Sequence, residues 1–237
     1  MGMTGLQILE AFVGKSGLSN VPVTNIAGTD ASSTQIKQLL FEVGRDLVSR
    51  KCWPQLKRTH TFTTIAGTSD YALPSDYYCS CLDTAWDTTN RWKLRGPQTD
   101  AAFNNLLWGY APISTWSSYR IFGRDTTMQF QLVPEPADAI DMQFDYVSNA
   151  WINNSGTWSS TSITNTSTFA FDDDLLLIGL SVVWPDNKGL LYDRYQAQYE
   201  KLISNAVARW NGSFKTMLSP EMNAWLYPNI EEGGWTI

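Results

Sequence analysis

The chain has 237 residues, of which only 17% are charged, and its 11 Trp, 10 Tyr and 10 Phe make it rich in aromatic side chains. A net charge of −6 argues against tight binding of nucleic acid, because phosphate binding depends on clustered Lys and Arg. The aromatic surplus fits either a tryptophan-rich core or a surface that is buried against partners.

Two helices are predicted in the first part of the chain. Residues 4–13 have apolar side chains at helical spacing, and residues 14–29 form a loop rich in Gly, Ser, Asn and Pro. Ser32 or Ser33 is placed to cap the second helix, which ends near Trp53 because Pro54 disfavours helix at the residue before it.

The pattern changes to a period of two between residues 56 and 151, which predicts short strands. Strands are expected within residues 59–64, 71–73, 77–83, 92–94, 119–122, 128–132 and 140–147, with a brief helix at 100–108. Gly123, Arg124 and Asp125 fit a hairpin turn. Strands at this spacing are typical of a small β-sandwich or barrel. The Ser/Thr/Asn tract at residues 153–168 fits either a mobile loop or an extended hairpin at the sheet edge.

Residues 171–211 are predicted to form two more helices with a break near Pro185. Residues 175–184 are apolar on nearly every side, so this helix must be surrounded by neighbours, yet it is too short to span a bilayer. Asp172, Asp173 and Asp174 precede it, where carboxylates cap free N–H groups. The second helix carries one apolar stripe.

The last segment, residues 213–237, is irregular but apolar, so it is not expected to move freely in water. It is predicted to contact a partner through Trp225, Leu226, Tyr227, Pro228, Trp235 and Ile237.

Helices at both ends and strands in the middle predict an α+β fold. We expect a four-helix bundle formed by residues 1–54 and 166–212, an inserted antiparallel β-sandwich or barrel at 55–165, and an extended tail at 213–237.

No pattern predicts an active site, a cofactor or a metal centre. The only histidine, His60, lies on a threonine-rich strand with no evident orienting partner. Cys52, Cys79 and Cys81 match no zinc-binding spacing, and Gly14-Lys15-Ser16 lacks the strand and first glycine of a phosphate loop. The carboxylate sets Asp138, Asp141, Asp145 and Asp83, Asp87 have no spacing that fixes a glycosidase pair. The N-terminus lacks a secretion signal, so synthesis in the host cytoplasm with reduced cysteines is expected.

A carbohydrate-binding β-sandwich module is one function that fits these strands, because exposed indole rings stack on sugars. The candidates are Trp86, Trp92, Trp108, Trp116 and Trp158. Such a module has no need for flanking helix pairs or an apolar tail.

Two blocks of the chain resemble the head-to-tail adaptor proteins of short-tailed, podovirus-type bacteriophages. The first is CWPQLKRTHTFTTIAGTSDYALPSDYYCSCLD, and the second runs from Tyr146-Val147-Ser148 through FDDDLLLIGLSVVW to NKGLLYDRYQAQYEKLISNAVAR. Pro185, Asp186 and Asn187 stand where the family pattern leads us to expect a longer basic helix. With the domain order, the resemblance covers most of residues 4–212.

The resemblance implies a structural virion protein of the phage neck without an active site. Copies would form a ring, expected to be dodecameric, between the portal protein and the tail nozzle or tail tube protein. Genomic DNA would pass through the channel without specific binding, and no membrane would be involved.

Overall fold

The computed structural model describes residues 2–16, 25–26, 31–109, 117–124, 127–189 and 193–211. Its helices are α1 (Gly5–Ser16), α2 (Ala31–Arg50), α3 (Asp100–Trp108), α4 (Asp173–Asn187) and α5 (Asp193–Asn211), with a 3-10 turn η1 (Pro54–Leu56). Its strands are β1 (Lys57–Thr63), β2 (Asp70–Ala72), β3 (Tyr77–Ser80), β4 (Trp86–Asp87), β5 (Trp92–Lys93), β6 (Ser118–Phe122), β7 (Gln129–Val133), β8 (Asp141–Ser148), β9 (Ile152–Asn154), β10 (Thr157–Ser159) and β11 (Thr168–Phe169). The predicted α+β class is confirmed, and the named strands pair antiparallel.

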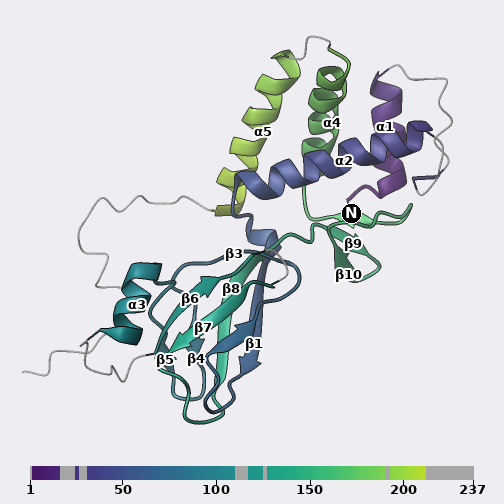
Figure 1. Ribbon diagram of the computed structural model, residues 1–237. Coiled ribbons are helices and arrows are strands. Elements are labelled where there is room, and N and C mark those ends of the chain that lie inside the picture. The colour runs from purple at the N-terminus through teal and green to yellow at the C-terminus, as the bar shows by residue number, and fades with distance from the viewer. Residues whose placement is uncertain are drawn as a thin grey trace, which may run out of the picture.

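Helix α4 is the central element of the helical body. It contacts α1, α2 and α5 (Figure 1). Its inner residues, Leu175, Leu176 and Leu180, are almost fully buried. An apolar helix of this kind is stable only when neighbours cover its surface, so the segments before and after the β-rich region must pack together.

Helix α2 lies across α1, α4 and α5, whereas a four-helix bundle has nearly aligned helices (Figure 1). The structure therefore does not confirm the predicted four-helix bundle. Glycine allows α2 to approach closely: a Cβ at Gly179 of α4 would lie 2.5 Å from Cγ1 of Val43, and a Cβ at Gly44 would lie 2.1 Å from the Trp151 ring. Side chains at these positions would separate α2 from α4 and from Trp151.

The two ends of α4 differ in detail from the prediction. Asp172 occupies the N-cap position, but its side chain makes no capping hydrogen bond and instead accepts one from Arg209 Nη2 at 2.9 Å. Asp173 and Asp174 lie in the first turn, where their charges favour the helix dipole. Pro185 lies inside α4, and the helix ends two residues later at Asn187.

Strand β8 is the centre of a five-stranded sheet with β1, β3, β4 and β5. It pairs with β1 from Lys57 opposite Val147 to Thr63 opposite Asp141, and its other edge pairs with β3 and β4. A second sheet has the order β2–β7–β6.

One aromatic core joins these two sheets. Phe130 of β7 stacks on Phe144 of β8, with ring centroids 5.1 Å apart, and on Tyr119 of β6 at 4.5 Å. The residues in this core come from both sheets. Closure into a sandwich or barrel remains a prediction.

The Ser/Thr/Asn tract forms a hairpin, which was one of the two predicted alternatives. The hairpin belongs to a separate three-stranded sheet and not to the edge of the β8 sheet. Strand β9 lies between β10 and β11. Ile152 and Ile163 belong to the core formed by the helices, and Asn165 Oδ1 accepts a hydrogen bond from the Ile26 amide at 2.8 Å. This small sheet therefore packs with the helical body.

Gly44→Ala should lower the free energy of unfolding by about 1–3 kcal/mol, because the new methyl group overlaps the Trp151 ring. This loss outweighs the gain of about 1 kcal/mol in helix propensity. Gly14→Ala is the matched control: it lies in α1, with nothing within 4 Å of an added Cβ, and should raise stability by about 0.5–1 kcal/mol. Urea titration followed by circular dichroism measures both, and a Gly44→Ala protein as stable as the parent would contradict the close-packing account.

Candidate interaction surfaces

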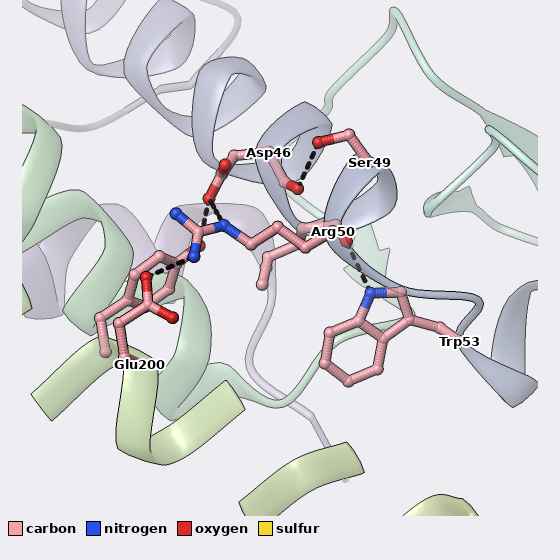
Figure 2. A network of polar contacts seen from close by, with 7 residues as sticks. Asp46, Ser49, Arg50, Trp53 and Glu200 are labelled. Atoms are coloured by element: carbon pink, nitrogen blue, oxygen red, sulfur yellow. Dashed lines mark hydrogen bonds and ion pairs between the residues drawn. The ribbon is translucent and has the colours of Figure 1, made fainter. Parts of the chain in front are cut away.

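A polar network fastens the end of α2 to α5 (Figure 2). Arg50 Nε donates a hydrogen bond to Asp46 Oδ2 at 2.7 Å, and Arg50 Nη1 donates to Glu200 of α5. The Tyr199 hydroxyl donates to the same Asp46 oxygen at 3.1 Å. Close by, Trp53 Nε1 donates to the Leu47 carbonyl at 2.6 Å. The network lies at the end of α2, where the chain passes from the helical body to strand β1 of the β-rich body.

Tyr199 is the buried member of this network. Burial raises the pKa of its phenol, and the nearby Asp46 carboxylate raises it further. The neutral phenol donates to Asp46 and packs below the Arg50 guanidinium, whose Cζ lies 5.4 Å from the ring centroid. The i,i+4 spacing of Asp46 and Arg50 was a sequence signal for half of this network. Nothing in the sequence pointed to Glu200 or Tyr199 as partners.

Residues that were considered for catalysis, His60, Asp141 and Asp145, make packing contacts or hydrogen bonds within the sheet. The His60 ring stacks with Phe62 at 5.8 Å and meets Phe144 edge-on at 5.4 Å, and burial lowers the pKa of its imidazole. Asp145 and Asp141 each accept a hydrogen bond from a β1 threonine at 2.7 Å. These contacts form a ladder across two strands.

The other carboxylate pair is divided between two local roles. Asp87 is buried and accepts hydrogen bonds from the backbone and side-chain amides of Asn90, both at 2.8 Å. Asp83 pairs with Lys93 at 3.0 Å. The hydrogen bonds between Asp87 and Asn90 close the turn between β4 and β5, and the ion pair of Asp83 and Lys93 stabilises the same hairpin.

Cys52, Cys79 and Cys81 are free thiols. Within the described ranges, no group of three or more His, Cys, Asp or Glu side chains is arranged to hold a metal ion.

Two of the tryptophans proposed for sugar stacking, Trp86 and Trp92, do not share one face. Trp86 pairs with Lys93 and Trp92 pairs with Asp87, so the two indoles point to opposite faces of the β4–β5 hairpin. Trp158 lies on β10, and one face of its ring is covered by Arg58, whose Cζ is 4.8 Å from the centroid. Trp116 lies outside the described residues.

Large apolar side chains are nevertheless exposed on the β-rich body. Trp108 at the end of α3 is 85% exposed, Leu82 after β3 is 72% exposed and Ile65 after β1 is 64% exposed. Single exposed apolar residues are normal, but a bulky indole in water at a helix end is typical of a contact surface.

Two hollows mark the helical body. One, of about 600 Å³, lies between α2 and β3 and is lined by Phe41, Arg45, Val48 and Tyr78, among others. The other, of about 500 Å³, lies at the start of α4 beside Asp172 and Arg209. Neither is lined by a His or Cys side chain.

The predicted contact residues of the C-terminal tail, Trp225, Leu226, Tyr227, Pro228, Trp235 and Ile237, lie outside the described residues. No helix in the described part of the chain combines the length and apolar character that a membrane crossing requires.

The model of the SU10 adaptor protein family matches residues 15–225. No curated protein matches the chain.

The chain belongs to the SU10 adaptor protein family. It is a structural adaptor protein of a bacteriophage and a virion component. The match spans α2 to α5 and the strands, so the resemblance to phage adaptors drawn from the sequence is confirmed at this level. The podovirus-type assignment remains a prediction.

Tyr199→Phe should flatten the loss of stability at alkaline pH. A tyrosine whose pKa is higher in the folded than in the unfolded state contributes stability that is present below about pH 10 and is lost as the pH rises. While only the unfolded state is deprotonated at this site, the free energy of unfolding of the parent falls about 1.4 kcal/mol more per pH unit than that of the variant.

Urea unfolding between about pH 8 and 11 measures the two slopes. Tyr195→Phe, an exposed position on α5, controls for the loss of one hydroxyl. Parallel curves for the parent and Tyr199→Phe would show that Tyr199 is not held by the network.

Proposed function

We propose that this adaptor is the subunit of an oligomeric ring, expected to be dodecameric, that joins the portal to the tail nozzle or tail tube. In this proposal the ring forms part of the channel through which the genome is ejected. The match to an adaptor family over residues 15–225 is the observation that carries it, because an adaptor must bind a component on each side.

The build of the subunit supports a ring. A heterologous ring subunit needs two lateral faces and separate docking faces above and below. Here a helical body and a β-rich body each have their own hydrophobic core, so they supply separate surfaces. The exposed Trp108 and Leu82 lie on the second body, where a neighbouring copy or the next tail component would cover them.

The charge of the chain supports passage of DNA rather than binding. With 17 basic and 23 acidic residues, the subunit has little capacity to release counterions from phosphates. A channel wall with this excess of acidic residues would let duplex DNA pass without binding its phosphates tightly.

The apolar tail supplies the proposed contact with the portal or a neighbouring subunit. Trp225, Leu226, Tyr227, Pro228, Trp235 and Ile237 are the residues assigned to it. A segment of this composition gains free energy when it orders on a partner, because its aromatic rings leave water.

Mixing the adaptor with the portal protein of its own phage and imaging the particles by electron microscopy tests the proposal. A ring of adaptor density added to one end of the portal is expected. The isolated chain is a weak test, since adaptors can remain monomeric until the portal templates them. Portal particles without added density, together with retention of the monomer on a glycan resin, would instead support the carbohydrate-binding alternative.

Deleting residues 213–237 should abolish docking to the portal, measured as loss of co-sedimentation, while the circular dichroism spectrum of the helical and β-rich bodies persists. A full-length variant with Trp225, Tyr227 and Trp235 changed to Ser should show the same loss, because the apolar rings drive the contact. Trp86→Ser is the matched control for removing an exposed indole elsewhere and should dock normally. Unchanged assembly of the deletion variant would refute the assignment.

A further inference from the structure

The cysteines of this chain gather where the helical body meets the β-rich body. Cys52 lies between the end of α2 and η1, and Cys79 lies on β3. Their Sγ atoms are 3.9 Å apart, although 27 positions separate them in the sequence. Cys52 is exposed and Cys79 is half-buried. A disulfide has an S–S length of about 2.05 Å, so the two side chains must turn toward each other before a bond can form.

Cys81 is the other thiol near this pair. It is two positions from Cys79 in an extended run, so both side chains lie on one face, and both pack against the helical core. Only Cys79 is in direct sulfur contact with Cys52 among the contacts described. The geometry therefore distinguishes between the two possible partners of Cys52.

We propose that Cys52 and Cys79 are a thiol pair that low-molecular-weight disulfides, such as oxidised glutathione, convert into an intramolecular disulfide. The Cys52 thiolate attacks one sulfur of oxidised glutathione, the S–S bond breaks, and one glutathione leaves as a thiolate that takes up a proton. Cys79 then loses its proton to solvent, attacks the Cys52 sulfur and expels the second glutathione. Two protein thiols are oxidised, and one glutathione disulfide is reduced to two thiols.

The surroundings of the two thiols set the order of these steps. Cys52 is exposed, so it meets the oxidant first. Burial, together with the neighbouring Cys52 thiol, raises the pKa of Cys79 to about 11. Cys79 is therefore a poor nucleophile toward a molecule in solution. Its attack is effective only when the mixed disulfide is held beside it, since proximity compensates for a small thiolate fraction.

The bond would tie the segment that leaves α2 to strand β3 of the β-rich body. This use of the bond rests on the proposed function: it joins the two bodies of each subunit after the virion leaves the reducing cytoplasm. Thiols persist during assembly inside the cell, and disulfides persist outside it.

The experiment uses the reduced full-length chain and oxidised glutathione as the probe. After the reaction is quenched with iodoacetamide, intact-mass analysis should show the loss of two hydrogen atoms and a single alkylated cysteine. Proteolysis without reduction should release a peptide pair joining Cys52 to Cys79, with the alkyl group on Cys81.

Cys52→Ser and Cys79→Ser should each abolish the internal disulfide, and Cys79→Ser should leave glutathione attached to Cys52. Cys81→Ser is the matched control, because it removes a thiol from the same face and should leave the disulfide yield unchanged. A stable glutathione adduct on the parent chain, three alkylated cysteines, or a bond involving Cys81 would overturn the proposal. Since none of these readouts involves the portal, failure here and failure of the proposed function are distinguishable.

Discussion

Covering helix α4 is the constraint on which the rest of the structure depends. Its buried residues are leucine and isoleucine, apart from Gly179 and Ser181. The Ser181 hydroxyl donates a hydrogen bond to the Leu177 carbonyl at 2.8 Å. Helices from both ends of the chain supply the cover, so the β-rich body between them must leave the helical body and return to it at one place. The pairing of Lys57 with Val147 shows that it does: the first strand out and the last strand back are neighbours at the junction.

The local elements could be predicted from the sequence because their determinants are local. The α3 helix spans Asp100–Trp108, the range that the pattern predicted, and the Thr99 side chain caps it by accepting a hydrogen bond from the Ala102 amide. The alternation of Thr59, Thr61 and Thr63 with half-buried residues gave β1 its exposed face. The direction in which α2 crosses α4 was not predictable, because it depends on Gly44 and Gly179 meeting Trp151 and Val43. These partners are far apart in the sequence, and no periodicity connects them.

The interaction surfaces were predicted less well, for a related reason. The tryptophan count fitted either a tryptophan-rich core or a surface buried against partners, and the sequence does not distinguish Trp108, which is exposed, from Trp53, which is buried. Pairing register decides that Trp86 and Trp92 face apart. The Ser/Thr/Asn tract fitted either a mobile loop or a hairpin, and the sequence could not decide between them. Its few apolar residues, such as Ile163, matter only because they pack into the helical core. The tail residues lie outside the described part of the chain.

Packing, rather than charge, holds the two bodies in position at the junction. The ion pair of Arg50 and Glu200 lies beside this junction but joins two helices of the same body, α2 and α5. Their side chains are 34% and 51% exposed, so the pair contributes about 0–1 kcal/mol and weakens with salt. Burial of an indole such as Trp53 removes about 150–250 Å² from water and contributes about 4–6 kcal/mol. Trp151 contributes similarly, less about 1–3 kcal/mol because its Nε1 has no hydrogen-bond partner among the described residues.

Trp53 and Trp151 both pack against Phe171, with ring centroids 5.4 and 6.1 Å apart, and so connect the outgoing and returning strands to the start of α4. A junction stabilised in this way depends little on ionic strength, because apolar burial is not screened by salt. That property suits a virion component, which passes from the cytoplasm to media of very different salt content without the chance to refold.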